Sequence, residues 1–405
     1  MAEATRPILI VGGGIGGLAT ALALATKGYR SHVLEQAAEF KEIGAGIQLG
    51  PNVFKMFSIL GMGLGMGLAE NIRRLATFPE SLIMMDCVTG EVVARIPLGQ
   101  EFLARFQFPY ALIHRADLLN VLLEACQQCD RITLETSRQV TAMTDHGDHV
   151  TVTTKEGPTH DGAALIGADG LWSTIRSLLL HDDKPRVSGH IAYRAVLPTA
   201  EVPERLRWQT MAFWAGEKTH LVIYPIRGGE LTNLVAVFHS KRYEEGWDSF
   251  GDPAELHERF AGTCEEVRTM LSKIESWRMW VLCDREPVKC WTRGRVALLG
   301  DAAHPMLQYL AQGACMAVED AVCLANQLEQ AGGDFERAFQ AYNQMRYLRT
   351  ARAQLTARLY GEVYHASGVA REVRNQVLSQ RTPQQAYDGL AWIYDGIEGT
   401  PPRSS

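Results

Sequence analysis

The chain has 405 residues, a length that predicts two or three domains of the usual size. Hydrophobic residues make up 46% of it and charged residues 21%, which excludes an intrinsically disordered or fibrous protein. The formal net charge of −6 at pH 7 predicts no general attraction to nucleic acids or to anionic membranes.

Targeting and redox features of the sequence favour a cytoplasmic protein. The longest apolar stretches, such as residues 59–69, are rich in glycine and shorter than the ~20 residues that cross a bilayer. The first residues, MAEATRP, lack the pattern of a signal peptide. In a reducing compartment the eight cysteines are expected to be free thiols. Cys126 and Cys129 form a CxxC, but they lie in a helical pattern with no further zinc ligands nearby, so we expect no metal site.

The N-terminal segment has the pattern of a dinucleotide-binding unit. Its elements are, in order, a buried parallel strand at 7–11, a glycine-rich turn at 12–17, a helix at 18–29 and a second strand at 31–34. Gly12 permits the tight turn, Gly14 lets a pyrophosphate approach the backbone, and Gly17 lets the helix pack against the strand. Glu35 ends the second strand, where it can accept hydrogen bonds from an adenosine ribose. The motif alone does not distinguish a flavin from a nicotinamide.

Two later strands end in aspartates. Residues 163–169 (AALIGAD) predict an apolar strand that ends at Asp169 and is followed by a helix. Residues 295–299 (RVALL) predict another, followed by Gly300 and Asp301. An acid after a strand can simply cap the next helix. Together with the N-terminal motif, however, these carboxylates favour a second segment of a ligand site.

The region between these two strands predicts an antiparallel sheet, and the last third of the chain is mostly helical. Its segments are rich in β-branched and aromatic residues and are separated by turns. The expected strands are at 191–197, 211–214, 220–224 and 234–238, with a long helix at 335–363 and frayed residues at the C-terminal end of the sequence.

The three separated motifs together resemble the class A flavin-dependent aromatic hydroxylases. The matching segments are VGGGIGG with Glu35, IGADGLWSTIR, and RVALLGDAAHP followed by a glycine-led helix; HRADL at 114–118 also fits. The resemblance covers residues 7 to about 365. It implies an α/β fold with a discontinuous Rossmann-like FAD-binding domain, an inserted antiparallel-sheet substrate domain and a C-terminal helical region. The expected domains are 1–80 with 105–182 and 283–365 for FAD, 81–104 with 183–282 for the substrate, and 366–405 for the helical segment and tail.

The resemblance implies a tightly held, non-covalent FAD, with NADH and O₂ as co-substrates and a homodimer as the assembly. In that family Glu35 binds the adenosine ribose, Arg115 contacts the flavin region, and Asp301 holds the ribityl chain. Asp169 lies in a loop implicated in pyrophosphate and NAD(P)H contacts. Gln48 lies where a family loop passes beside the isoalloxazine, and backbone N–H groups at 313–316 begin a helix next to it. The expected cofactor residues are Gly12, Gly14, Ile15, Gly17, Glu35, Gln36, Gln48, Arg115, Asp169, Asp301, Gly313, Ala314 and Cys315.

Three stretches narrow the resemblance within the family. HLVIYPIRGGE at 220–230, DREPV at 284–288 and HPMLQYLAQGACMAVEDA at 304–321 are similar to the enzymes that hydroxylate 3-hydroxybenzoate at carbon 6. This implies para-hydroxylation of a small aromatic acid to 2,5-dihydroxybenzoate (gentisate) through a flavin C4a-hydroperoxide. One departure is Cys315, because the related salicylate hydroxylases usually have Asn there; any role of that side chain is therefore in doubt.

The substrate chemistry points to three catalytic candidates. A free phenol has a pKa of about 10, and its phenolate is far more nucleophilic, so a nearby base must favour the anion. His220 suits this role, and Tyr224 lies four residues on, hence on the same face of a strand. The resemblance brings Gln308 to the opposite side of the pocket. The alternative for His220 is a structural histidine bonded to a neighbour.

Other functions stay open from the sequence. A salicylate-type hydroxylase attacks the carbon that carries the carboxylate and releases carbon dioxide, and another phenolic acid is also conceivable as substrate. A flavin-free NAD(P)-dependent dehydrogenase and a non-catalytic binding module are alternatives from other classes. Asp301 and the intact glycine motif argue against both. The preference for NADH over NADPH and the subunit count are not determined by the sequence.

Overall fold

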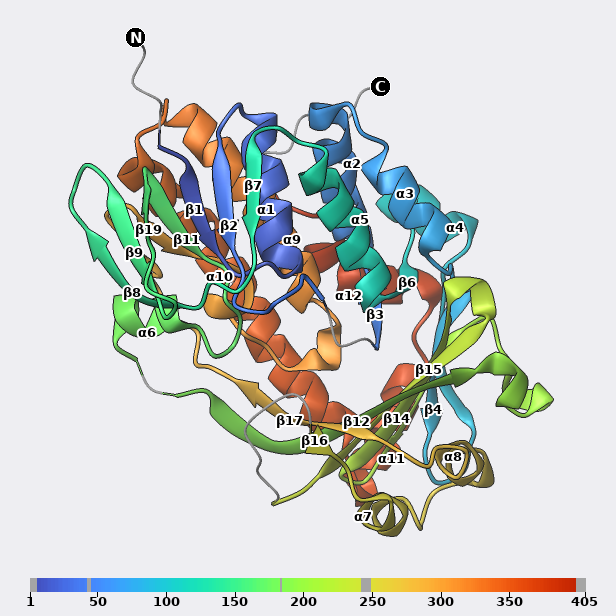
Figure 1. The fold of residues 1–405 in the computed structure, drawn as a ribbon. Helices are drawn as coiled ribbons and strands as arrows, with labels where there is room; N and C mark the ends of the chain where they lie inside the picture. The colour runs from blue at the N-terminus through green and yellow to red at the C-terminus, as the bar shows by residue number, and fades with distance from the viewer. Residues whose placement is uncertain (1–5, 42–44, 183, 242–248, 398–405) are drawn as a thin grey trace.

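A six-stranded sheet forms one half of the structure, a computed structural model that describes residues 6–41, 45–182, 184–241 and 249–397 (Figure 1). Its strands, in spatial order, are β18 (Thr292–Arg293), β19 (Val296–Leu298), β11 (Ala164–Gly167), β1 (Ile8–Val11), β2 (Ser31–Leu34) and β7 (Ile132–Glu135). All neighbours pair in parallel except β18, which is antiparallel to β19. The strands predicted at 7–11, 31–34, 163–169 and 295–299 are therefore present, each within two residues of its expected ends.

Helices cover this sheet and complete an α/β unit. α1 (Ile15–Thr26) packs against α9 (Gly313–Gln330) and α5 (Arg115–Gln127), and their apolar side chains share one core with the strands. The other helices of this half are α2 (Pro51–Leu64), α3 (Leu68–Leu75) and α6 (Thr174–Leu180). A three-stranded sheet of β8 (Val140–Asp145), β9 (Val150–Thr154) and β10 (Thr159–Gly162) flanks it. The strand β1, the turn and α1 follow the predicted order of a Rossmann-like unit.

An eight-stranded sheet forms the other half. Its strands, in order, are β16 (Ser249–Phe250), β17 (Arg278–Asp284), β12 (Arg186–Pro198), β15 (Leu231–His239), β14 (Thr219–Ile226), β13 (Met211–Gly216), β4 (Ser81–Asp86) and β5 (Val92–Pro97). The long central strands pair antiparallel, as the sequence predicts. Short helices α7 (Pro253–Arg259) and α8 (Glu265–Leu271) pack on one face, which we call the outer face. The combination of both halves confirms the expected fold class; the domain boundaries stay a prediction.

The opposite, inner face of the eight-stranded sheet is turned toward the first half. Because side chains alternate along a strand, it presents every second residue of β12, β14, β15 and β17. The cross-strand pairs on it include His190 with His239, Ala192 with Val237, and Tyr224 with Asn233. The short helix η5 (Gln308–Leu310) lies over this face and contributes Tyr309 to its apolar cluster.

Several segments join the two halves. The 30-residue helix α10 (Phe335–Tyr364) packs on α9 and on η5 and ends beside the large sheet (Figure 1). The two-stranded sheet of β3 (Gly46–Leu49) and β6 (Ala111–His114) lies between the halves. The remaining helices are α4 (Gln100–Phe106), α11 (Gly368–Ser379) and α12 (Pro383–Tyr394), with single turns η1 (Thr199–Glu201), η2 (Glu204–Leu206), η3 (Arg227–Gly229) and η4 (Gly300–Ala302). The C-terminal end expected to fray, residues 399–405, lies outside the described residues.

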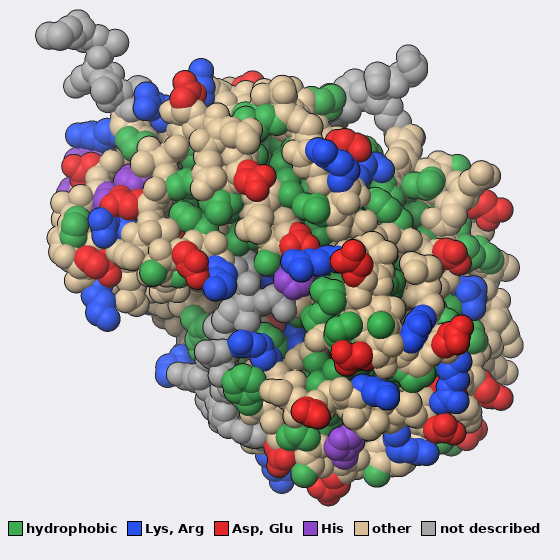
Figure 2. Space-filling view, turned by 45° about the vertical axis from the view of Figure 1, so that its right-hand side comes forward, with side chains coloured by type: hydrophobic (Ala, Val, Ile, Leu, Met, Phe, Trp, Pro, Cys, Tyr) green, Lys and Arg blue, Asp and Glu red, His purple; other side chains and the backbone are tan. Residues whose placement is uncertain are grey.

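Two further expectations can be compared with the structure. Across the described residues no helix has the length and apolarity needed to cross a bilayer. All eight cysteines have free thiols; α5 ends at Gln127, so Cys126 lies in the helix and Cys129 just beyond it. Basic and acidic side chains are interspersed over the face shown in Figure 2, in keeping with the small net charge.

Candidate functional site

The carboxyl ends of four adjacent strands bring the sequence motifs together. In the order β19, β11, β1, β2 these strands are followed by Asp301, Asp169, Gly12 and Glu35. Since parallel strands end at the same edge of a sheet, residues from widely separated parts of the chain meet there. This edge is where open α/β sheets bind nucleotides.

The glycine turn is shaped for close backbone approach. Gly12 has φ +106°, and a Cβ at this position would overlap the carbonyl oxygen of Ala168. A Cβ at Gly17 would overlap the carbonyl oxygen of Gly12. Gly14 caps α1, which begins at Ile15, so the unpaired N–H groups of the first turn face outward as an anion site. The turn therefore fits the pyrophosphate of a dinucleotide.

Glu35 lies beside this turn. Its Oε2 accepts a hydrogen bond of 2.7 Å from the Gly13 N–H, and its Oε1 accepts one of 2.8 Å from the Ala37 N–H. Gln36, next to it, is exposed. The carboxylate is held against the glycine turn, and its remaining lone pairs are available to the hydroxyls of a ribose.

Asp301 and Asp169 differ in a way that bears on their roles. Asp169 accepts hydrogen bonds from the Ser173 hydroxyl (2.5 Å) and from the Ile175 N–H (3.1 Å), so it stabilises the start of α6. Asp301 makes no such capping bond to η4. Its side chain is exposed, yet desolvation by the surrounding protein raises its pKa, against the opposing charges of His304 and Arg115. The Asp301 carboxylate is thus accessible and can bind a polar ligand.

The start of α9 lies next to Asp301. A Cβ at Gly313 would be 3.6 Å from the Oδ1 of Asp301. The Met316 N–H is taken by the carbonyl of Gln312 at 2.8 Å, which corrects the expectation of a donor at 316. Gly313, Ala314 and Cys315 supply the first N–H groups of the helix. Cys315 is buried, and burial raises the pKa of its thiol to about 12, so the thiol is unreactive.

A buried ion network fixes α9 in place. Arg346 of α10 contacts Asp320 and Glu319, each at 2.6 Å. Glu319 also accepts a hydrogen bond of 2.8 Å from Asn52, and Asp320 pairs with His304 at 2.6 Å. These groups are fully or almost fully buried, and the two carboxylates keep pKa values below their usual range because cations and donors offset their burial. His304 is therefore a structural residue.

The segment around Gln48 connects the nucleotide edge to the inner face. The Gly46 N–H donates a hydrogen bond of 2.7 Å to Oδ1 of Asn233, and a Cβ at Gly46 would overlap the ring of Tyr224. Gln48, two residues on, accepts a hydrogen bond from the Tyr110 hydroxyl. The Cys315 thiol at the start of α9 lies 4.0 Å from the carbonyl oxygen of Gln48, so this segment adjoins the helix start next to Asp301.

Arg194 is the unexpected residue of the inner face. It donates a hydrogen bond to Oε1 of Gln308, and its guanidinium lies 5.3 Å from the centre of the Trp280 ring. Burial lowers its pKa, and among the described residues its charged neighbours are Tyr224 and Arg115, with no carboxylate. Its Nε is buried without a hydrogen-bond partner. A buried cation without a counter-ion is costly unless a ligand provides one.

His220 and Tyr224 both lie on the inner face. Nδ1 of His220 is joined by a hydrogen bond of 2.8 Å to Nε2 of His365, the residue that ends α10. Burial, then the neighbouring His190 and His239, lowers the pKa of His220 to about 3. Burial raises the pKa of Tyr224, which therefore stays protonated. His220 is bonded to a neighbour, yet among the described residues its Nε2 makes no hydrogen bond and can serve a ligand.

Sequence reasoning brought the glycine turn, Glu35 and Asp301 to one edge, and the structure places them there. It missed Arg194, Asn233 and His365. The alternation of His190, Ala192 and Arg194 along one strand could have revealed Arg194 as an inward-facing cation. His365 lies 145 residues from its partner His220, and the sequence contains no local signal of that contact.

Comparisons with known proteins identify the family of the chain. The family model described as "FAD binding domain" matches residues 5–356. The chain is 45% identical over 391 residues to 3-hydroxybenzoate 6-hydroxylase of Polaromonas naphthalenivorans, covering 96% of each chain. It is 47% identical over 394 residues to 3-hydroxybenzoate 6-hydroxylase of Klebsiella oxytoca, covering 97% of each. The crystal structure of Klebsiella pneumoniae HpxO complexed with FAD and uric acid superposes with a TM-score of 0.83 at 26% identity, covering 96% of each chain.

Proposed function

The chain belongs to the class A FAD-dependent aromatic hydroxylases, and on this basis we propose that it hydroxylates 3-hydroxybenzoate at carbon 6. The product is 2,5-dihydroxybenzoate, with NADH as the reductant and O₂ as the oxidant. NADH, a proton and O₂ are consumed, and gentisate, NAD⁺ and water are formed. The names of the relatives support the substrate; the observation that carries the proposal is Arg194.

Arg194 requires an anionic ligand on the inner face. Arg194 is half-buried, its guanidinium lies beside an aromatic ring, and it has no carboxylate partner among the described residues. A benzoate carboxylate supplies the missing charge through two parallel hydrogen bonds, a geometry for which guanidinium is suited. Gln308, already bonded to Arg194, orients that guanidinium.

The spacing on the sheet suits a meta-hydroxylated benzoate. Arg194 pairs with Val235, and His220 with Val237, so β15 lies between their two strands. Two strand spacings of about 4.8 Å and an offset of two residues along β15 put the backbones of Arg194 and His220 roughly 12 Å apart. On this proposal one aromatic ring spans the gap, with its carboxylate at Arg194 and its hydroxyl at His220.

The reaction then follows from the substrate and these side chains. When bound, FAD supplies the electrons from NADH and activates O₂. Nε2 of His220 accepts the phenol proton, and the resulting phenolate raises electron density at carbon 6, which is para to the oxygen. Tyr224, held protonated by burial, donates a hydrogen bond toward the ring oxygens. The apolar residues of the inner face exclude water from the pocket.

The cofactor residues have separate roles in this scheme. The glycine turn binds the pyrophosphate, Glu35 the adenosine ribose and Asp301 the ribityl hydroxyls. Arg115, Gln48 and the start of α9 surround the flavin ring. Asp169 acts mainly by capping α6. A homodimer and a cytoplasmic location remain predictions.

The test is a product assay on the purified yellow protein. It is incubated with NADH or NADPH and a panel of 2-, 3- and 4-hydroxybenzoate, and the products are identified by mass and retention time. We expect gentisate from 3-hydroxybenzoate with NADH. Catechol and carbon dioxide from 2-hydroxybenzoate would instead favour the salicylate-type reaction, and no hydroxylated product from any of them would refute the proposal.

A further inference from the structure

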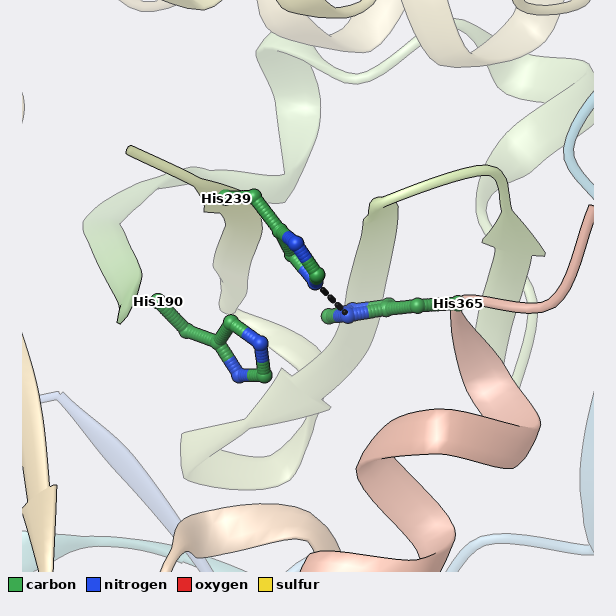
Figure 3. A group of neighbouring side chains, drawn as sticks. All are labelled: His190, His239 and His365. Carbon is green, nitrogen blue, oxygen red and sulfur yellow. Dashed lines mark hydrogen bonds between the residues drawn. The ribbon is translucent and has the colours of Figure 1, made fainter. Parts of the chain in front are cut away.

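Four histidines form a cluster at one end of the inner face. His190, His220 and His239 come from β12, β14 and β15, and His365 ends α10. Figure 3 shows three of them, with the ring of His365 pointing from the helix toward that of His239. The Lys218 N–H donates to the carbonyl of His365 at 3.3 Å, which anchors the end of α10 on this sheet. We call these four residues the histidine cluster.

Three members of the cluster form a continuous chain of hydrogen bonds. Nδ1 of His220 bonds to Nε2 of His365 at 2.8 Å, and Nδ1 of His365 bonds to Nε2 of His239 at 2.9 Å. The chain begins at His220, which is 3% exposed, and reaches half-buried His239 near the surface. A neutral imidazole has one donor and one acceptor nitrogen, so each ring can donate to the next one outward.

The surroundings keep the chain neutral. His190 stacks on His239 at 4.1 Å between ring centres and bonds to the Tyr309 hydroxyl, and Tyr364 lies beside His220. Glu362 raises the pKa of His239 and Lys218 lowers it, while Arg374 lowers the pKa of His365. Burial is the largest cause for all four histidines and lowers their pKa values, to about 4 for His190.

This neutrality creates a difficulty for His220 as an isolated base. A buried imidazole that cannot hold a positive charge is a poor final acceptor for the phenol proton. If His220 releases its Nδ1 proton to a neighbour while its Nε2 takes the phenol proton, the imidazole stays neutral throughout.

We propose that His365 and His239 relay the substrate's phenol proton from His220 to solvent, an inference that rests on the proposed function. The phenol O–H bond breaks and an N–H bond forms at Nε2 of His220. The Nδ1 proton of His220 moves to Nε2 of His365, the Nδ1 proton of His365 moves to Nε2 of His239, and the Nδ1 proton of His239 goes to water. Each ring ends as the opposite neutral tautomer, and protonation of the product phenolate through the same chain restores the start. His365 and His239 act through His220 and do not touch the substrate.

A metal site is the competing explanation. One ring nitrogen each from His190, His239 and His365 lie within 4.8 Å of one another. In the structure, however, Nε2 of His239 and Nδ1 of His365 face each other in a hydrogen bond, and a metal ion would have to break it. The two explanations differ in the role of His190. A metal ion would need it as a ligand, whereas the relay does not use it.

The experiment compares His239→Gln with His190→Gln in the FAD-loaded enzyme. Glutamine at 239 can still bond to His365 but cannot pass a proton. In weakly buffered solution we expect His239→Gln to reduce its flavin with NADH within about twofold of the wild-type rate. Its oxygen-transfer rate should fall about tenfold or more, with hydrogen peroxide released instead of product. Added imidazole should restore several-fold of the loss, because His239 is half-buried at the outer end. His190→Gln should behave like the wild type.

Each contrary result has a distinct meaning. Unchanged oxygen transfer in His239→Gln, or a loss that imidazole does not restore, would overturn the relay. Equal losses in His190→Gln and His239→Gln, with one metal ion per wild-type chain by elemental analysis, would establish a metal site in its place. A wild-type enzyme that hydroxylates no hydroxybenzoate would refute the proposed function itself. An active wild type together with a fully active His239→Gln variant would refute only the relay.

Discussion

Replacing Arg194, whose guanidinium has no carboxylate partner among the described residues, should change substrate affinity and folding stability in opposite directions. Arg194→Met keeps the length and most of the apolar contact of the side chain but removes the charge. The side chain of Arg194 is half-buried and has no carboxylate partner among the described residues. Removing it therefore eliminates a desolvation penalty, and the free energy of unfolding should stay the same or rise.

Binding of 3-hydroxybenzoate should weaken strongly in the same variant. Truncating one partner of a buried, hydrogen-bonded charge pair costs about 2–4 kcal/mol. At 1.4 kcal/mol per factor of ten, this corresponds to a roughly 30- to 700-fold increase in Kd. Arg194→Lys should recover only part of the affinity, because an ammonium cannot form the two parallel hydrogen bonds.

The assay is titration of the flavin absorbance with 3-hydroxybenzoate and with its neutral analogue 3-hydroxybenzamide, together with thermal unfolding. Wild type should prefer the acid, and Arg194→Met should lose that preference while it keeps its affinity for the amide. Arg205→Met is the matched control, since Arg205 pairs with Glu265 at the exposed surface. If Arg194→Met lost affinity for acid and amide equally, or unfolded at a lower temperature, Arg194 would be a packing residue.

Three further predictions address the cofactor, the base and pH. Asp301→Ala should weaken FAD binding ten- to a hundredfold, measured by FAD titration, with little effect on the stability of the apoprotein. Asp169→Ala should instead lower the free energy of unfolding of the apoprotein by about 1 kcal/mol, measured by thermal melting, because the cap of α6 is lost. His220→Ala should still oxidise NADH but form far less gentisate per NADH, and Tyr224→Phe should show a milder loss. An unchanged yield of gentisate per NADH in His220→Ala would show that His220 has only a structural role. Burial lowers the pKa of all four cluster histidines below the unfolded value of ~6.5, so the unfolded chain binds more protons in mild acid. The free energy of unfolding should thus fall as pH drops from about 6.5 toward 4, by up to about 1.4 kcal/mol per pH unit for each histidine, and His365→Gln should flatten this slope in urea titrations.

The nucleotide half was predictable because its signals are local. A β-branched run, a glycine turn and an Ala/Leu helix follow one another within about 30 residues. β1 and β2 lie within one residue of their predicted ends, and α1 begins and ends three residues earlier than predicted, because the last glycines of the turn already belong to the helix. The parallel strand ends then bring Asp301 and Glu35 together by topology alone. Asp169 shows the limit of this reasoning. It also follows a strand of the sheet, but its carboxylate is bonded to the start of α6.

The inner face was harder to predict because its contacts depend on register between strands. A shift of one residue in the pairing of β12 with β15 would turn Arg194 and His190 to the outer face. The contact of His365 with His220 depends in addition on where a 30-residue helix ends. Register and helix length are set by packing of the whole core, so the isolated sequence identifies His220 but not the residues that complete its hydrogen bonds. The same burial that lowers the pKa of His220 also packs His365 and His239 against it. The packing of α10 on the sheet therefore has two effects. It makes His220 a poor base on its own, and it places next to His220 the two histidines through which a proton can reach solvent.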